Sequence, residues 1–225
     1  LSKSESQYRL VVNTVKEVIF QTDIDGNWIF LNPAWTNIMG YTIEESLGQN
    51  FSSYIHNEEK EKNFDVLRPL ITGELEFSLH DVIFVTKGGK EKICEVYVKS
   101  IVSENKNVVG ISGTIRDITL QRESEQEIRK LNRAVETTET GILLADFKGN
   151  ISYANPGLMS ICGFKSHDHI VGKSIFSLTS IEGSRVLKEA IITRLMSGNN
   201  WKGEIELRKV NGKFFPAEAI CSVVF

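Results

Sequence analysis

The stretch Asp25-Gly-Asn-Trp-Ile-Phe-Leu-Asn-Pro33 decides the fold of this chain because it occurs twice. Its second copy is Lys148-Gly-Asn-Ile-Ser-Tyr-Ala-Asn-Pro156, and the matching glycines, Gly26 and Gly149, are 123 residues apart. In each copy a Gly-containing turn is followed by a short strand-like run that ends at Asn-Pro. This period exceeds the roughly 20–50 residues of solenoid repeats, so it indicates two copies of a whole domain.

The same spacing of 123 residues holds far outside this stretch. One residue is inserted where Gly48 falls against Gly172, but the register is restored near the end of the chain. Two tandem domains explain this persistence better than chance. The residue pairs at this spacing include Asp23 and Asp146, Gly40 and Gly163, Tyr41 and Phe164, Gly89 and Gly212, and Glu95 and Glu218.

The first half of each copy predicts a hairpin followed by a short helix. Residues 17–23 and 28–31 are rich in β-branched and aromatic side chains, and the turn signal Asp25-Gly26 lies between them. Two such runs around a Gly-containing turn predict antiparallel strands. Asn32 directly before Pro33 predicts a helix N-cap with proline in the first turn, and Gly40 suits the helix C-terminus.

The rest of the first copy predicts a helix and three long strands. Residues 57–72 carry apolar side chains at helical spacing, and Pro69 is expected to kink this helix or to begin its last turn. Strands are predicted over residues 76–86, 90–103 and 108–119. A strand pair, then helices, then three strands describe an antiparallel α+β domain of about 100 residues.

The second copy follows the same order but stops after its fourth strand, residues 213–225. An antiparallel sheet that lacks a central strand leaves strand edges unpaired. We therefore expect this copy to be less stable or to acquire a partner. The sequence also begins at Leu1 without Met and ends inside an apolar run, so we expect a piece of a longer protein whose output lies elsewhere.

The segment between the copies, residues 120–136, predicts a long helix, and residues 1–15 predict a similar helix ahead of the first copy. The linker contains no Gly or Pro and is rich in Glu, Arg, Gln and Leu, which favour helix. Its a-d-a seam is apolar at one end and polar at the other, which suits weak parallel pairing with a second chain. The alternative is a single helix that packs back on its own domain. The seam positions are Ile128, Leu131 and Val135, preceded by Gln121 and Ser124.

Composition and charge exclude several classes of protein. The 225 residues are 41% hydrophobic and 24% charged, as in soluble globular domains. A net charge of -3 argues against nucleic-acid binding and against a polybasic membrane surface, and no apolar run reaches the length of a membrane helix. Three scattered cysteines, Cys94, Cys162 and Cys221, predict free thiols in a reducing compartment, which indicates the cytoplasm.

In their order and spacing, these motifs resemble the PAS family. The first copy also closes with Asp117-Ile118-Thr119, a triplet common at the last strand of PAS domains that feed a coiled-coil helix. The resemblance covers residues 16–120 completely and residues 137–225 without a last strand. The matching positions of the first copy are Asp23, Gly26, Asn32, Pro33, Gly40, Tyr41 and Gly48.

The resemblance implies two α+β domains, each a five-stranded antiparallel sheet with helices on one face, a fold that can enclose a ligand pocket. It divides the chain into an N-terminal helix at residues 1–15, a first PAS domain at 16–119, a helical linker at 120–136 and a second, C-terminally truncated domain at 137–225. Members of the family are usually input modules of histidine kinases, cyclic-dinucleotide enzymes or transcription regulators.

We therefore expect a cytoplasmic sensory module of a bacterial or archaeal signal-transduction protein, most like a multi-sensor histidine kinase. The fragment itself is not expected to be an enzyme, because it contains no phosphate-binding glycine loop and no Ser-His-Asp set. The expected partners are a second copy of the chain, a downstream kinase or other output domain in the same chain, and a small-molecule ligand, without nucleic acid or membrane insertion. Two alternatives stay open: a ligand-free dimerisation or protein-interaction module, and a redox sensor with non-covalent flavin.

Haem is not expected. Some PAS sensors hold haem through a histidine on the long helix, and residues 57–72 and 183–196 contain none. His56 precedes the first of these helices and His80 falls on a predicted strand, so both are interpreted as ordinary polar positions.

Other cofactors and metals are also not predicted. Covalent-flavin members need a cysteine after Gly-x-Asn, where this chain has Phe51 and, in the second copy, Ile175, so cysteinyl-flavin chemistry is excluded. Trp35 could stack on a non-covalent flavin, although a core position is the commoner role for such a residue. His167-Asp-His169 near Cys162 supplies half of a zinc site, and a solvated loop is the preferred interpretation.

Two sets of candidate site residues follow from strand alternation and helical spacing. The first would line a ligand pocket, and the alternative is that its members simply fill a core. The second would relay a signal from the last strand of the first domain into the linker helix. The pocket candidates are Phe20, Ile29, Leu31, Trp35, Ile38, Phe64, Leu67, Phe77, Leu79 and Val96. The relay candidates are Asp117, Ile118, Thr119, Ile128, Leu131 and Val135.

Overall fold

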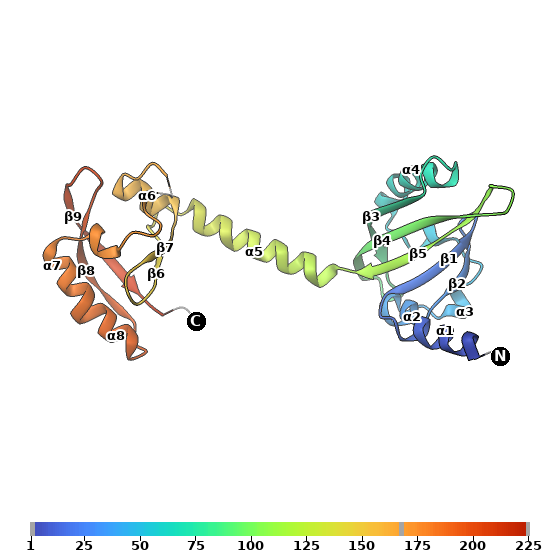
Figure 1. Ribbon diagram of the computed structural model, residues 1–225, viewed down its shortest axis with the longest axis horizontal. Helices are drawn as coiled ribbons and strands as arrows, with labels where there is room; N and C mark the ends of the chain where they lie inside the picture. Colours follow the sequence, from blue (N-terminus) through green and yellow to red (C-terminus); the bar gives the residue numbers. More distant parts are fainter. Residues whose placement is uncertain (1–2, 167–168, 224–225) are drawn as a thin grey trace. The chain divides into compact units, whose positions relative to one another are not determined.

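The computed structural model describes residues 3–166 and 169–223 and separates the chain into two compact units, Leu1–Gln126 and Glu127–Phe225 (Figure 1). The first unit begins with helix α1 (Lys3–Thr14). It continues with a hairpin of β1 (Val18–Asp23) and β2 (Trp28–Leu31).

The hairpin turn is held by one carboxylate. Asp23 Oδ1 accepts a hydrogen bond from the backbone N–H of Asn27 at 2.8 Å, and Asp23 Oδ2 accepts one from Asn27 Nδ2 at 2.9 Å. Gly26 has a φ of +85°, a conformation that glycine adopts readily. The pairing register shifts between Gln21 and Thr22, which is the signature of a β-bulge.

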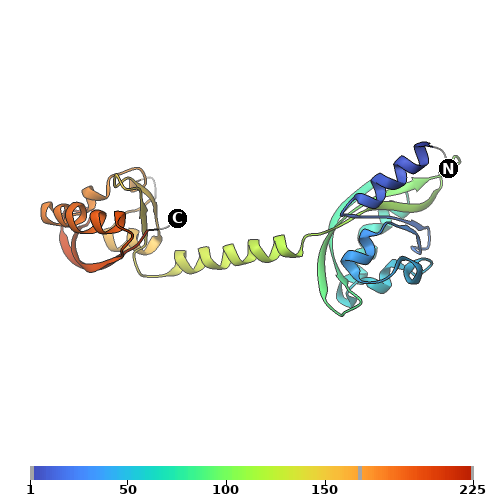
Figure 2. The same cartoon turned by 90° about the horizontal axis from the view of Figure 1, so that it is seen from below.

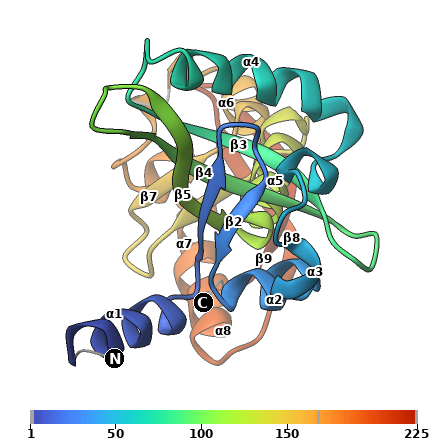
Figure 3. The same cartoon turned by 90° about the vertical axis from the view of Figure 1, so that its right-hand side faces the viewer.

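Helices and three further strands complete the first unit. The helical segments are α2 (Ala34–Met39), α3 (Ile43–Ser46), the short 3₁₀ helices η1 (Phe51–Tyr54) and η2 (Asn57–Glu59), and α4 (Lys60–Ile71). The strands are β3 (Phe77–Val85), β4 (Glu91–Val102) and β5 (Val108–Asp117). All neighbouring strands are antiparallel, in the order β2-β1-β5-β4-β3 (Figure 1, with a second view in Figure 3). The predicted five-stranded antiparallel sheet is therefore confirmed.

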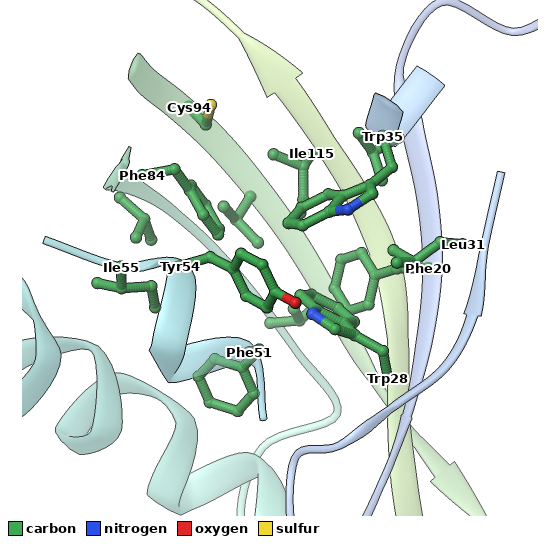
Figure 4. Close-up of a cluster of buried hydrophobic side chains, with 14 of the residues drawn as sticks. Phe20, Trp28, Leu31, Trp35, Phe51, Tyr54, Ile55, Phe84, Cys94 and Ile115 are labelled. Atoms are coloured by element: carbon green, nitrogen blue, oxygen red, sulfur yellow. The ribbon is translucent and has the colours of Figure 1, made fainter. Parts of the chain in front are cut away.

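The core of the first unit is built around interlocking aromatic rings (Figure 4). Trp35 is fully buried, and its ring centroid lies 5.4 Å from that of Trp28 and 5.1 Å from that of Tyr54. The indole Nε1 of Trp35 donates to Ser46 Oγ at 2.8 Å, so α2 is joined to α3 by a satisfied buried bond.

The second unit repeats these elements with the same spacing. Its segments are β6 (Leu143–Ala145), β7 (Ile151–Ala154), α6 (Pro156–Cys162), η4 (Ile175–Leu178), α7 (Ile181–Val186), the π-helical turn η5 (Leu187–Ile192), α8 (Thr193–Met196), β8 (Trp201–Arg208) and β9 (Phe214–Cys221). β6 pairs with β7, and β8 pairs with β9. Among the described residues no strand joins β6 to β9, whereas β5 joins β1 to β4 in the first unit.

Helix α5 (Thr119–Thr137) is continuous along its length (Figure 2). None of its residues is buried, and the seam positions Ile128 and Leu131 are 58% and 61% exposed. Both seam side chains are therefore largely exposed. No helix in the described parts of the chain is both long enough and apolar enough to cross a membrane.

The expected asparagine cap is present in only one copy. Asn155 caps α6 by accepting a hydrogen bond from the N–H of Leu158 at 2.9 Å, with Pro156 in the first turn. The prediction is wrong for Asn32: α2 has no side-chain cap, and Asn32 Oδ1 instead accepts from the N–H of Ile19.

Substitution of two glycines by alanine should affect the stability of the first domain very differently. A Cβ atom at Gly113 of β5 would lie 1.9 Å from the backbone oxygen of Tyr97, whereas one at Gly88 would meet nothing within 4 Å. Gly113→Ala should therefore lower the free energy of unfolding by at least about 2 kcal/mol, and Gly88→Ala should change it by less than about 0.5 kcal/mol. Urea unfolding followed by tryptophan fluorescence compares them, and equal midpoints would contradict this account of β5.

Candidate functional site

A small cavity of about 20 Å³ lies between the sheet and α4 of the first unit. Most of its wall is apolar, with β-sheet residues such as Val96 and Ile115 on one side and Leu67 of α4 on the other. Four residues with polar groups also line it: Thr22, Trp28, Asn63 and His80.

A hydrogen-bonded pair bridges α4 and β3 at this wall. Asn63 Nδ2 lies 3.4 Å from His80 Nε2, and His80 Nδ1 lies 3.2 Å from Ser78 Oγ. Burial lowers the pKa of His80, and the charge of Lys62 lowers it further, against an opposing effect of Asp81. Neutral His80 can accept a hydrogen bond from Asn63 at Nε2 and donate one to Ser78 from Nδ1.

On two residues that line the cavity, a buried polar atom has no hydrogen-bond partner among the described residues. The two atoms are Nε1 of Trp28, a donor, and Oδ1 of Asn63, an acceptor. The two residues are only 3% and 6% exposed. An unsatisfied buried polar group costs about 1–3 kcal/mol, so either atom would be stabilised by a hydrogen-bond partner.

A second cavity of about 140 Å³ adjoins the first. The two share Thr22, Phe51, Leu67 and Ile111 as walls, and the second is bordered by the 23–26 turn. Movement of these shared side chains would merge the two spaces. An apolar cavity of about 150 Å³ is large enough to hold benzene.

The structure brings together only part of the predicted pocket. Phe20, Leu67 and Val96 line the first cavity, and Phe64 and Leu67 line the second. The other buried candidates lie in the core without lining either cavity: Leu31, Trp35 and the partly buried Ile38.

Three pocket candidates were assigned to the wrong face. Ile29, Phe77 and Leu79 are 52%, 57% and 59% exposed. On β2 the bulge breaks the regular alternation, so that Trp28 and Leu31 are the buried residues. On β3 the inward series is Ser78, His80, Val82 and Phe84.

Sequence reasoning therefore missed Asn63 and His80 as cavity residues. A signal for His80 was present, because Asp81 shares its strand face with Phe77 and Leu79 and is exposed. In a strand whose side chains alternate between two faces, a carboxylate marks the face exposed to solvent. His80, next to Asp81, therefore belongs to the inward face. Nothing in the sequence distinguished Asn63 from the other polar residues of its helix.

The last residues of β5 tie the start of α5 to the sheet. Asp117 pairs with Lys92 of β4, and Asp117 Oδ1 accepts hydrogen bonds from the N–H and the hydroxyl of Thr119 at 3.0 and 2.6 Å. Thr119 Oγ1 in turn accepts from the N–H of Ile93 at 3.0 Å. Burial alone would raise the pKa of Asp117, but the bonds from Lys92 and Thr119 outweigh it and hold the pKa below its usual range.

Two further contacts hold the first turn of α5. Ile118 is buried, and its N–H donates to the oxygen of Ile93 at 2.9 Å. Arg122 Nη2 donates to Asp81 Oδ2 of β3 at 2.5 Å. The predicted relay residues Asp117, Ile118 and Thr119 thus lie together, whereas Ile128 and Leu131 lie on the free length of the helix.

The candidate half zinc site lies partly outside the described residues. His167 and Asp168 lie outside the described residues, and the described ones contain no group of three or more metal-ligating side chains. His56 caps a 3₁₀ turn, and its Nε2 lies 3.6 Å from Glu91 Oε1. The repeated Glu95 and Glu218 form surface ion pairs with Arg116 and Lys202.

Comparison with known proteins matches both units to one family. Residues 6–118 match the PAS fold and residues 139–225 match the PAS domain. A PAS domain of a protein from Colwellia psychrerythraea superposes with a TM-score of 0.48 at 23% identity, covering 52% of this chain and 98% of that one.

Two curated relatives are histidine kinases or sporulation kinases by name. Sporulation kinase C of Bacillus subtilis is 29% identical over 164 residues, 72% of this chain and 37% of that protein. The methanogenesis regulatory histidine kinase FilI of Methanothrix harundinacea is 28% identical over 139 residues, 59% of this chain and 15% of that protein. The chain thus spans well under half the length of either relative. With its five-stranded sheet and one family match on each copy of the repeat, the chain belongs to the PAS family and carries two PAS domains in tandem.

Proposed function

We propose that this chain is the sensory input module of a signal-transduction protein, in which the first PAS domain senses a small molecule and α5 relays the response. The single observation that carries this proposal is the attachment of the helix to the sheet. Thr119 bonds both Asp117 of β5 and Ile93 of β4, so the first turn of α5 moves with the two strands. The kinase relatives support a downstream histidine kinase in the parent protein.

A short path leads from the cavity to this attachment. Val96 and Ile115 are direct cross-strand partners and both line the cavity. Two residues along, the next partners on that face are Cys94 and Asp117. A ligand that displaces Val96 or Ile115 would therefore alter the strand pair immediately before the helix, because close-packed side chains transmit such shifts.

The ligand that fits best is a small neutral molecule with one hydrogen-bond acceptor and one donor. The acceptor would take the Nε1 proton of Trp28, and the donor would bond Asn63 Oδ1. Two cavities of about 20 and 140 Å³ suit a ligand of benzene size better than an isoalloxazine ring. Trp35, the residue considered for flavin stacking, lines neither cavity.

Exposed apolar positions on α5 favour a parallel homodimer as part of the same function. Ile128 and Leu131 are three residues apart on a helix with no buried side chain, and Val135 continues the seam. Pairing would bury them, as in a coiled coil. If the first domain binds nothing, dimerisation alone becomes the function, and concentration-dependent size measurements on Ile128→Lys and on the wild type would test the seam.

Removing the unpartnered acceptor should abolish ligand binding. The purified chain is first examined by visible absorption, and then by mass spectrometry of molecules released on denaturation. We expect a colourless protein that releases a small molecule, and Asn63→Leu should retain at least tenfold less of it. The exposed Asn107→Leu is the matched control. A flavin band, or equal retention by both variants, would overturn this assignment of the ligand.

His80 should make the stability of the first domain pH-dependent. Its pKa is lower in the folded state than in the unfolded chain, so the neutral ring contributes stability above about pH 6.5. This contribution is lost as the pH falls through the folded-state pKa. The free energy of unfolding of His80→Gln should accordingly decline less steeply than that of the wild type between about pH 7 and pH 5, measured by urea titration. Identical slopes would count against the buried neutral histidine.

Asp117→Ala should free the helix without unfolding the domain. Loss of the bonds to Lys92 and Thr119 is expected to speed amide exchange over residues 119–126 at least tenfold, with exchange in β3 and β4 changed less than twofold. Asp65→Ala, which removes an exposed carboxylate on α4, is the control. Signalling in the full protein should be lost in Asp117→Ala and retained in Asp65→Ala. Signalling that persists in Asp117→Ala would contradict the proposed relay through α5.

A further inference from the structure

One buried asparagine in the first domain holds the end of the preceding helix. Asn32 lies between β2 and α2 and is 1% exposed. Its Nδ2 donates to the backbone oxygens of Val12 and Glu17, both at 3.0 Å, and its Oδ1 accepts from the N–H of Ile19 at 3.0 Å. Val12 lies in the last turn of α1, so this one amide joins the end of α1 to β1.

The second domain repeats the arrangement on α5. Asn155 Nδ2 donates to the backbone oxygens of Val135 and Thr140 at 3.0 and 2.9 Å, and Asn155 Oδ1 accepts from the N–H of Ile142 at 2.7 Å. Each of these positions lies 123 residues after its counterpart in the first domain. Asn155 is fully buried, and Val135 lies in the last two turns of α5.

Two bonds in the second domain have no equivalent in the first. Asn155 Oδ1 also accepts from the N–H of Leu158 in the first turn of α6, whereas α2 has no side-chain cap. The hydroxyl of Tyr153 donates to Glu136 Oε1 at 2.5 Å, and the corresponding residue of the first domain is Phe30. Helix α5 therefore has one side-chain bond to its domain, from Tyr153, that α1 lacks.

The bonds from Asn155 to the end of α5, to Ile142 and to Leu158 are called the clamp below, and their chemistry requires an amide. The final carbonyls of a helix lack intrahelical partners, and a carboxamide is the neutral side chain that offers two N–H donors and an acceptor on one small plane. Because all of these bonds meet on one buried group, a displacement of the Val135 carbonyl must shift or break the bonds to Ile142, before β6, and to Leu158, in α6.

We propose that Asn155 is the positioning residue through which the second PAS domain receives the movement of α5. The inference rests on the proposed relay role of α5 and adds the receiving contact to it. Asn32 is the equivalent residue for whatever movement reaches α1.

Asn155→Asp separates the two halves of the clamp. The carboxylate keeps an acceptor for Ile142 and Leu158, but it loses both donors to Val135 and Thr140. Amide exchange over residues 131–141 of the 225-residue chain should rise at least tenfold, while exchange over residues 156–165 changes less than threefold. Asn32→Asp is the matched control and should loosen only residues 8–18. Unchanged exchange over 131–141 would refute the clamp.

The coupling itself is measured in a double-mutant cycle. With Asn155 intact, Asp117→Ala should change the exchange of the amides of Ile142 and Leu158 at least threefold. In the Asn155→Asp background that response should disappear, which a merely structural residue would not cause. If Asn155→Asp does not fold, as judged by circular dichroism, Asn155→Ser replaces it, since serine keeps one acceptor but cannot span both carbonyls.

The outcomes separate the two proposals. A response to Asp117→Ala that persists without the amide shows that α5 acts on the second domain by another contact, and the role of Asn155 is refuted while the relay stands. No response even with Asn155 intact refutes the relay and the coupling role together. The exchange over 131–141 then still decides whether Asn155 clamps the helix end.

Discussion

The last strand of the first domain is also the central strand of its sheet, and the rest of that domain depends on this constraint. β5 pairs with β1 on one side and with β4 on the other, so it unites the N-terminal hairpin with the hairpin of β3 and β4. Because α5 begins at Thr119, two residues after β5 ends, the helix leaves from the middle of the sheet and not from its edge.

This position gives the proposed sensor a short internal route. The route follows the strand pair β4 and β5. It leads from the cavity wall to the Asp117 carboxylate, and from there by a hydrogen bond to Thr119 in the first turn of α5. Between its ends, α5 carries exposed side chains, Ile128 and Leu131 among them. Its fixed points are the two ends, where backbone groups are bonded by Thr119 at the start and by Asn155 at the finish.

Much of the fold could be predicted from the sequence because the chain contains two copies of the domain, and residues present in both copies mark its turns. Gly26 and Gly149 both adopt positive φ, and the turns at Asp23 and Asp146 are bonded in the same way. The candidate site was harder to predict. A single bulge reverses the face of Ile29, and the cavity depends on side chains from α4 and β3 that meet only after folding.

Comparison of the two copies also explains why the helix cap predicted for Asn32 was wrong. Asn-Pro before a helix indicates a cap, and Asn155 acts as one. Asn32 shares its sequence context but serves the helix behind it, a role that depends on a contact 20 residues away in the chain, with Val12. A local sequence pattern predicts only bonds to residues nearby in the chain. Bonds of the same residue to distant parts of the chain cannot be predicted from it.

A strand that is last in sequence and central in space also determines when the domain can form during translation. Val18 pairs with Ile115, so the N-terminal hairpin waits for almost the entire domain to be synthesised before its inner edge is covered. Such non-local pairing slows folding and leaves strand edges open to aggregation in the meantime. The segment that becomes α5 follows immediately, so the nascent chain gains its relay helix only as the sensing domain becomes able to close.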